Sequence, residues 1–431
     1  MKGNESRWQQ RTDVLPTDRG DEFAHYPYVT AKELRKRKER PRRVKMLLRD
    51  FIDDSLYNPS YGYFSKQAII FTPGKPFDFH ELDDNLSFQQ ELGRRYNQFE
   101  DKLDAVRPDE TRQLWHTPTE LFGAVYAEAM ARYLMANYRL TTYPYDDLSI
   151  FEMGAGRGTL MLNVLDYIRD ADPDVYARTR YTVIEISKPL AKLQEGRLRS
   201  SAAARGHKDR VEIVPVSIFE WDRYVPKPCF FLALEMGPPP LQSHVLIDGQ
   251  GNMYEFLSRT LDPVADRYLA ARDAATGGLY ATPYPTGRLA RWLPRFSSSR
   301  LSPPEYIPTR LMELFEVLDR YFPAHRLLAS DFDVLPQAVE GLNGPVVQTR
   351  FRRSMVAVST PLVHQGFFDM LFPTDFPVAE ALYRAMTGKF TRLCSHADFM
   401  HRWADVDRTR TRSGESPLLL HYRNASVLLT V

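Results

Sequence analysis

A glycine-rich segment near the middle of the chain constrains the fold most. The run Leu148–Met153 is mostly apolar, and Gly154, Gly156 and Gly158 follow it directly. A short apolar run that ends at glycines indicates a buried strand leading into a tight turn, although such a turn alone occurs in many strand–helix connections. The apolar pattern of residues 158–168 predicts a helix after the turn, and the first N–H groups of a helix are free to bind a ligand.

Strand and helix patterns alternate beyond this turn. Residues 181–186 predict a strand and residues 188–204 a helix. Further strands are predicted at 211–214, 230–234 and 327–332, with 345–348 and 426–431 as closing strands. This alternation is typical of an α/β fold, a doubly wound, mostly parallel sheet of the Rossmann-like kind. Ligands of such sheets bind beyond the carboxyl ends of the strands.

Two carboxylates accompany the glycine turn. Glu152 lies at the end of the first strand, and Glu185 ends the second. A carboxylate after the second strand binds the ribose hydroxyls of a nucleoside. The spacing here is Gly-x-Gly-x-Gly, and an acidic turn would repel a pyrophosphate. The sulfonium and ammonium groups of S-adenosylmethionine suit the turn better, so the sequence predicts a methyl-donor site, with no metal, in preference to an NAD site.

A third carboxylate ends another predicted strand. The apolar run that starts at Cys229 ends at Glu235, at the same edge of the predicted sheet. A carboxylate there would hold an arginine guanidinium or an amine against the methyl group. The alternative is that Glu235 only caps a loop.

The rest of the chain predicts a discontinuous organisation. We expect a flexible basic arm over 1–42, a helical region on the substrate side over 43–140, and a core divided into 141–254 and 323–431 by an inserted cap at 255–322. Within the helical region, residues 46–56 predict a helix and residues 72–110 a loop. A further helix starts at Thr117, with Pro118 in its first turn, Glu120 in the capping-box position, and a buried face of Leu121, Val125, Met130 and Leu134.

Composition excludes several classes of protein. The formal net charge of +2 gives no reason to expect nucleic-acid binding. Two cysteines in the whole chain predict neither a disulfide framework nor a cysteine-based metal site. No apolar run approaches the roughly 20 residues that span a bilayer, and the first residues lack the features of a transit or secretory signal. The basic run 32–45 is either a solvated surface or a docking patch for an acidic partner.

The ordered motifs resemble those of the MidA-like methyltransferases, a family that includes a mitochondrial arginine methyltransferase of complex I assembly. The resemblance covers roughly residues 43 to 431. Its later motifs look like those of the longer plant and fungal branch of the family. It is carried by Tyr57-Asn-Pro-Ser-Tyr-Gly-Tyr-Phe64, Thr117-Pro-Thr-Glu120, Phe151-Glu-Met-Gly-Ala-Gly-Arg-Gly-Thr159, Val183-Ile-Glu-Ile-Ser187, Ala329-Ser-Asp-Phe332, Phe372-Pro-Thr-Asp-Phe376 and Ser416-Pro-Leu-Leu419.

The resemblance implies a class I methyltransferase that uses S-adenosylmethionine to dimethylate an arginine symmetrically on a complex I subunit in the mitochondrion. It assigns the donor to Glu152, Gly154, Gly156, Gly158, Thr159, Glu185 and Ser187, and the acceptor to Glu235. Candidates on the substrate side are Tyr61, Tyr63, Thr117 and His244. A protein substrate is implied, whereas the sequence assigns no oligomeric state.

One segment departs from the family pattern. After the strand that ends at Glu235, relatives carry an acidic segment, whereas this chain has three consecutive prolines within residues 236–244. The second carboxylate expected there is missing, and prolines remove N–H donors and stiffen the loop. The alternative function is therefore a methyltransferase-like scaffold or assembly protein that keeps the donor-binding fold without the catalysis.

Overall fold

The structure is a computed structural model, and it describes residues 20–66, 68–109, 112–185, 200–234, 243–257, 262–279, 305–336, 338 and 344–431. The chain divides into two compact units, each assembled from three separate segments. Unit 1 comprises Met1–Gln67, Gly237–Glu316 and Val334–Lys389, and unit 2 comprises Ala68–Met236, Val317–Asp333 and Phe390–Val431. The boundaries expected from the sequence, with a core divided by an inserted cap, stay a prediction.

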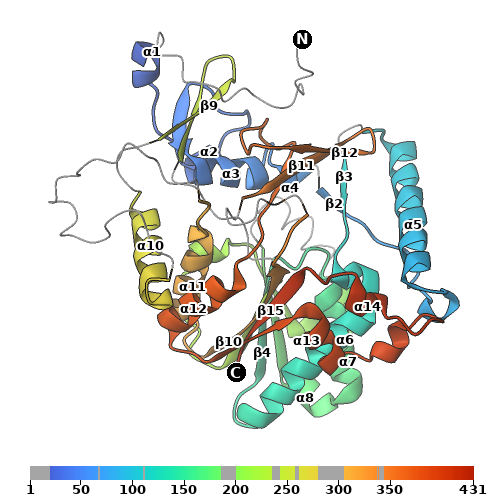
Figure 1. Ribbon diagram of the computed structural model, residues 1–431. Helices are drawn as coiled ribbons and strands as arrows, with labels where there is room; N and C mark the ends of the chain where they lie inside the picture. The colour runs from blue at the N-terminus through green and yellow to red at the C-terminus, as the bar shows by residue number, and fades with distance from the viewer. Residues whose placement is uncertain are drawn as a thin grey trace. The chain divides into compact units, whose positions relative to one another are not determined.

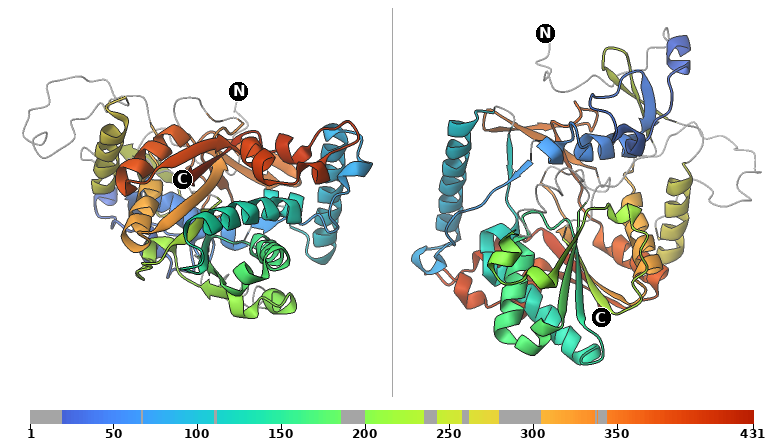
Figure 2. Two further views of the ribbon diagram at one scale, coloured as in Figure 1. Left: turned by 90° about the horizontal axis from the view of Figure 1, so that it is seen from below. Right: turned by 180° about the vertical axis from the view of Figure 1, so that it is seen from behind.

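Unit 2 is built on a seven-stranded sheet, with strand order β14-β15-β10-β7-β4-β5-β6 (Figures 1 and 2). β4 pairs in parallel with β5 and β7, β7 with β10, and β5 with β6, whereas β15 is antiparallel to both of its neighbours. The strands are β4 (Leu148–Met153), β5 (Thr179–Ile184), β6 (Val211–Val214), β7 (Cys229–Ala233), β10 (His325–Phe332), β14 (Thr391–Ser395) and β15 (Ala425–Thr430). This confirms the predicted doubly wound, mostly parallel fold.

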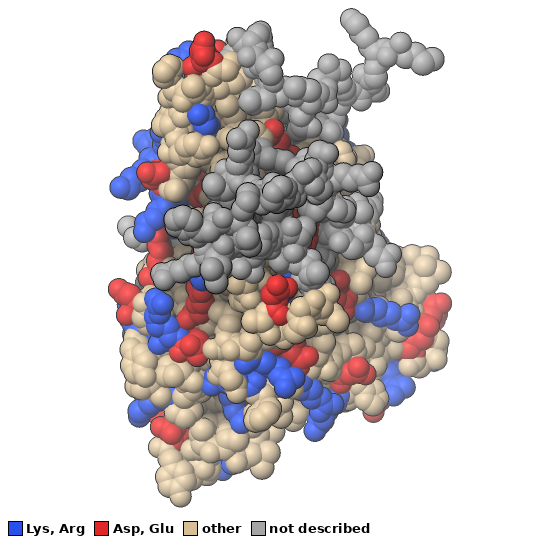
Figure 3. Space-filling view, turned by 60° about the vertical axis from the view of Figure 1, so that its left-hand side comes forward, with Lys and Arg blue, Asp and Glu red and all other residues tan. Residues whose placement is uncertain are grey.

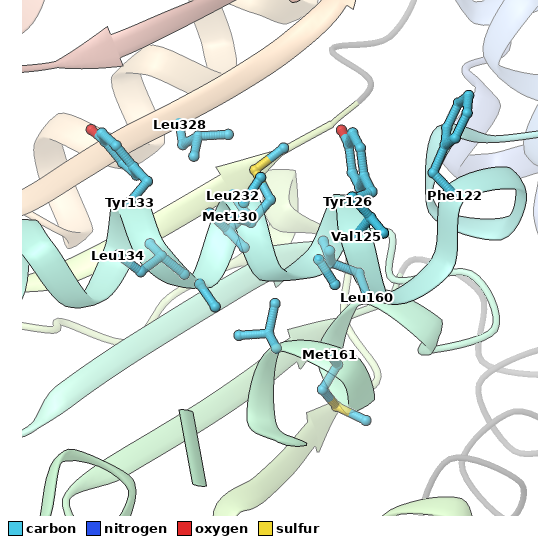
Figure 4. Packing of buried hydrophobic residues seen from close by; sticks show 14 of the residues in the cluster. Phe122, Val125, Tyr126, Met130, Tyr133, Leu134, Leu160, Met161, Leu232 and Leu328 are labelled. Atoms are coloured by element: carbon cyan, nitrogen blue, oxygen red, sulfur yellow. The ribbon is translucent and has the colours of Figure 1, made fainter. Parts of the chain in front are cut away.

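Two long helices cover one face of this sheet. The face of α6 (Pro118–Thr141) that was predicted from the sequence is buried, and it packs on α7 (Thr159–Ala171) and on the sheet (Figure 4). Removing these side chains from water is the main stabilising term for such a layer, at roughly 25 cal/mol per Å² of apolar surface. Other helices of this unit are α8 (Pro173–Ala177), α13 (His396–Trp403) and α14 (Pro417–Leu420).

The prediction of a loop over residues 72–110 is wrong for most of that range. α5 (Asn85–Val106) occupies it, and Asp84 caps the helix by accepting a hydrogen bond from the backbone N–H of Ser87 (2.8 Å). Phe88 and Leu92 are buried, and they begin an apolar series at helical spacing that the many charged residues obscured. Two short strands, β2 (Ala68–Ile70) and β3 (Gln113–Trp115), pair in parallel on either side of α5 in the sequence.

The described residues of unit 1 form two three-stranded sheets. The first joins β1 (Val44–Leu47), β8 (Ser243–Ile247) and β9 (Met253–Leu257), and the second joins β11 (Val346–Phe351), β12 (Ser354–Val358) and β13 (Asp369–Leu371). Residues 345–348 were therefore wrongly expected to close the main sheet. The helix expected over 46–56 starts later, as α3 (Leu48–Tyr57), because residues 44–47 pair with β8.

Short and medium helices complete unit 1. Residues 20–34, at the N-terminal end of the described chain, are part of this folded unit. Phe23 and Tyr26 pack with Leu246, so this part of the expected flexible arm is an ordered element. The helices are α1 (Gly20–Ala24), α2 (Ala31–Leu34), α4 (Tyr63–Lys66), α10 (Pro263–Thr276), α12 (Phe376–Thr387) and the first part of α11 (Thr309–Tyr321), which ends in unit 2.

The surface carries charges of both signs. On the face shown in Figure 3, basic and acidic side chains are interspersed among the described residues, in keeping with the small net charge. Among the helices of the described ranges, none combines the length and the apolar character needed to cross a membrane.

Candidate functional site

The glycine turn after β4 has a backbone that only glycine adopts easily. Gly154, Gly156 and Gly158 have φ angles of +70°, +54° and +76°, a region that costs other residues roughly 1–2 kcal/mol. A Cβ on Gly156 would lie 3.0 Å from Cδ1 of Ile70 in β2, whereas a Cβ on Gly154 would meet open space. Gly158 caps α7, so the turn leads directly to the free N–H groups of a helix.

The second strand brings Glu185 to the same edge of the sheet. The backbone N–H of Gly154 donates to the carbonyl of Ile184 (3.0 Å), and that of Glu185 donates to the carbonyl of Val214 (3.1 Å). Glu185 therefore leaves β5 beside the point where the glycine turn leaves β4. The negative charge of Glu185 also contributes, as the smallest of the causes, to the raised pKa of Glu152.

Glu152 lies beneath the turn and is only 3% exposed. Burial raises its pKa from 4.5 to about 7; the hydroxyl of Tyr181, which donates to Glu152 Oε2 at 2.9 Å, opposes this shift, and the negative charge of Glu185 adds to it. A nearby cation would favour the charged carboxylate. A cation that binds at this edge of the sheet would therefore lower the pKa of Glu152 and favour its ionised form near neutral pH.

Thr117 and Thr159 both lie at helix starts in unit 2. Thr117 caps α6 by accepting from the backbone N–H of Glu120 (3.3 Å). The predicted capping box is only half formed, because the carboxylate of Glu120 instead accepts a hydrogen bond from the hydroxyl of Thr159 at 2.6 Å. This contact connects the start of α6 to the end of the glycine turn.

The remaining candidates do not all join this group. Tyr61, Tyr63 and His244 belong to unit 1. The Tyr61 hydroxyl contacts both carboxylate oxygens of Asp54 (2.8 and 2.9 Å), the ring of Tyr63 is fully buried, and His244 stacks on Phe256 with 5.1 Å between ring centroids. Their role on the substrate side stays a prediction.

Two further candidates lie outside the described residues. Ser187 falls in the gap 186–199 and Glu235 in the gap 235–242. The three prolines that depart from the family pattern fall in the second gap as well. The assignments of Ser187 to the donor and of Glu235 to the acceptor therefore stay predictions.

Sequence reasoning missed the roles of Tyr181 and Glu120 at this site. Tyr181 lies on β5 two residues before Val183, which pairs with Glu152, so the tyrosine reaches the carboxylate diagonally across the strands. Once the pairing of Glu152 with Val183 was known, the position of Tyr181 two residues before Val183 could have indicated this hydrogen bond. No local pattern indicated the partner of Glu120.

Removing the Tyr181 hydroxyl tests the origin of the raised pKa. In Tyr181→Phe, the charged form of Glu152 loses its hydrogen-bond donor, so its pKa should rise further, by up to about one unit. The measurement is an NMR titration of ¹³C-labelled glutamate carboxyls, with Glu152→Gln identifying the resonance. An unchanged or lower pKa would contradict the proposed contribution of Tyr181.

The site suits a cationic nucleoside. The glycine turn leaves open space at Gly154 and leads to the N-terminus of α7. Glu185 follows the neighbouring strand β5, and the two carboxylates would favour a positively charged group. A pyrophosphate would be repelled by the same carboxylates. Among the described residues, no group of three or more His, Cys, Asp or Glu could hold a metal ion. The fold defines the chain as a class I methyltransferase architecture.

Comparison with known proteins agrees with this class. Residues 129–394 match a family described as "Putative S-adenosyl-L-methionine-dependent methyltransferase", and the chain belongs to this family. The resemblance to the MidA-like methyltransferases is thereby confirmed. A relative from Schizosaccharomyces pombe, named "Protein arginine methyltransferase NDUFAF7 homolog, mitochondrial", is 24% identical over 387 residues, which cover 84% of this chain and 80% of the relative.

A solved structure supports the fold independently. The crystal structure of a protein from Burkholderia thailandensis bound to S-adenosyl-homocysteine matches with a TM-score of 0.54. The match covers 90% of this chain and 88% of that one at 12% sequence identity. At this identity the likeness establishes the shared fold.

Proposed function

We propose that this protein is an S-adenosylmethionine-dependent arginine methyltransferase that symmetrically dimethylates a protein substrate. The observation that carries the proposal is the glycine turn flanked by Glu152 and Glu185, in a chain of this methyltransferase family. The name of the S. pombe relative supports arginine as the acceptor.

Each candidate residue has a distinct task in this proposal. The backbone of Gly154, Gly156 and Gly158 receives the methionine part of the donor, with Glu152 as the charge closest to its ammonium group. Glu185 accepts hydrogen bonds from the ribose hydroxyls. When bound, the donor supplies a methyl group on a positively charged sulfur.

The acceptor side rests on Glu235. A guanidinium remains protonated in water, so the protein must remove it from solvent, pair its charge and aim one nitrogen at the methyl group. A carboxylate two residues after β7 in the sequence would do this by hydrogen-bonding the guanidinium. Holding the two reacting groups in line supplies much of the rate enhancement in such a transfer.

We further propose that the protein acts in the mitochondrion, on a subunit of complex I. The S. pombe relative is named as mitochondrial, and the motif resemblance implies the role in complex I assembly. Import of a tagged full-length chain, followed by fractionation, tests the location.

Methyl transfer from labelled donor to arginine-containing complex I peptides tests the activity. Wild-type protein should label an arginine that mass spectrometry identifies as symmetrically dimethylated, and Glu235→Gln should lose at least about 100-fold in rate. Glu212→Gln is the matched control, because Glu212 lies on β6 in an exposed ion pair with Arg223. No transfer by the wild type, or equal transfer after Glu235→Gln, would refute the proposal.

The scaffold function is the second candidate, and the three prolines of residues 238–240 favour it. A scaffold would bind the donor but transfer no methyl group to any complex I peptide. Titration calorimetry with S-adenosylmethionine, run beside the transfer assay, distinguishes the two: binding without turnover supports the scaffold, and turnover excludes it.

A further inference from the structure

The start of α6 differs from an ordinary helix start. Thr117 is the N-cap and Pro118 the first helical residue, but Gly123 has φ +48° and ψ −119°, so the first turn is set off from the rest of the helix by a kink. Phe122 lies on this turn, ahead of the residues that pack on α7 (Figure 4). Because of this kink, the first turn, with Glu120 on it, points in a different direction from the rest of α6.

From this first turn, Glu120 contacts Thr159 at the end of the glycine turn. Its Oε1 accepts a hydrogen bond from Thr159 Oγ1 at 2.6 Å. Thr159 is the first residue of α7 after its N-cap Gly158. The N-terminus of a helix carries a partial positive charge, which stabilises a carboxylate placed beside it.

We propose that Glu120 is a positioning residue for the donor and that its charge makes the site prefer S-adenosylmethionine to S-adenosylhomocysteine. The inference rests on the proposed function and goes beyond it, since it assigns a specificity determinant outside the strand-end carboxylates. The donor carries one more positive charge than its product, because transfer of the methyl group converts the sulfonium to a neutral thioether. A third carboxylate at the turn therefore stabilises the donor complex more than the product complex, which would help the product to leave.

A purely structural role would give a different pattern. If Glu120 only joined α6 to α7, a glutamine would serve nearly as well, because its amide oxygen also accepts a hydrogen bond from Thr159. The charge, in contrast, is lost in Glu120→Gln. The substitution therefore separates the electrostatic contribution from the hydrogen bond.

The matched control lies on the same helix. Glu128 forms ion pairs with Arg132 (3.1 Å) and Arg408 (2.7 Å) and lies two turns beyond Glu120. Glu128→Gln removes an equal charge from α6 without touching the glycine turn. It should leave the ratio of donor to product affinity unchanged, even if it lowers stability.

Titration calorimetry on the full chain with three ligands tests the inference. In Glu120→Gln we expect the affinity for S-adenosylmethionine to fall about tenfold, and the affinity for S-adenosylhomocysteine to fall about twofold or less. Sinefungin carries an ammonium group in place of the sulfonium and should follow the donor. Circular dichroism of each variant confirms that it is folded.

The outcomes separate this inference from the proposed function. If the wild type binds neither donor nor product, the donor site itself is wrong and the inference falls with it. If the wild type binds both and Glu120→Gln weakens all three ligands equally, or none of them, Glu120 is structural and only the inference is overturned. A selective loss of the two cationic ligands, absent in Glu128→Gln, supports it.

Discussion

Replacing Gly156 with alanine is expected to weaken the binding of S-adenosylmethionine about 100-fold. The φ angle of +54° costs alanine roughly 1–2 kcal/mol. The new Cβ would also lie 3.0 Å from Cδ1 of Ile70, so either this methyl group or the turn must move by a few tenths of an ångström. The free mutant avoids these costs, together about 2–3 kcal/mol, by leaving the native turn conformation, so donor binding must restore that conformation and loses up to this amount of free energy. Titration calorimetry measures it.

Gly206→Ala is the control for this substitution. Gly206 has φ +81°, is exposed, and has no atom within 4 Å of the position of a Cβ, so alanine there carries the backbone cost alone. The control should lower stability modestly and leave donor affinity within about twofold. Equal donor affinity in Gly156→Ala and wild type would show that the donor does not use this turn.

Replacing Glu152 with glutamine should remove a large pH dependence of stability. The pKa of Glu152 is raised from 4.5 to about 7 in the folded protein, so folding favours its protonated form. Its contribution is fully present below pH 4.5 and is lost as the pH rises through 7. The free energy of unfolding of the wild type should therefore fall, relative to Glu152→Gln, by on the order of 3 kcal/mol over this interval.

Urea denaturation at a series of pH values, read with a probe in unit 2, gives the difference between the two proteins. Glu212→Gln serves as the control, since the exposed Glu212 lies outside the buried group. A constant difference between wild type and Glu152→Gln from pH 4.5 to 8 would contradict the raised pKa.

The same carboxylate links donor binding to protons. A bound ammonium or sulfonium group favours the charged form of Glu152, so the donor should lower its pKa and bind with release of a proton near pH 7. The affinity of the wild type for S-adenosylmethionine should accordingly rise between about pH 6 and 8, whereas that of Glu152→Gln should be weaker and nearly constant. Calorimetry in buffers with different ionisation enthalpies counts the released proton.

The core of the sheet was predictable from the sequence because its strands are short, apolar and bounded by turn residues. The predicted bounds of β4 and β6 agree with the structure, those of β7 differ by one residue, and those of β5 and the start of β10 differ by two. The glycine turn and the approach of Glu185 to Glu152 followed from the order of strands, since parallel strands end at one edge.

Pairing between distant segments was not predictable in the same way. The strand at 345–348 was recognised as a strand, but its own residues do not specify whether it joins the main sheet or β12 and β13. Likewise, the pattern S/T-x-x-E around Thr117 predicts a capping box, and only the kink at Gly123 and the position of Thr159 explain why Glu120 binds elsewhere.

The composition of the two units was likewise not predictable, because it depends on contacts between distant segments. The sequence predicted a core divided by an insertion, but composition along the chain does not indicate which three segments assemble into each unit. α5 was missed for a different reason: its charged surface obscured the apolar series that begins with Phe88 and Leu92.

A crystal structure of the protein with S-adenosylhomocysteine tests the central claim most directly. We predict that the ribose hydroxyls lie within hydrogen-bond distance of the Glu185 carboxylate and that the homocysteine part lies against the backbone of residues 154–158. A product molecule bound away from this turn, or one whose ribose makes no contact with Glu185, would contradict the account.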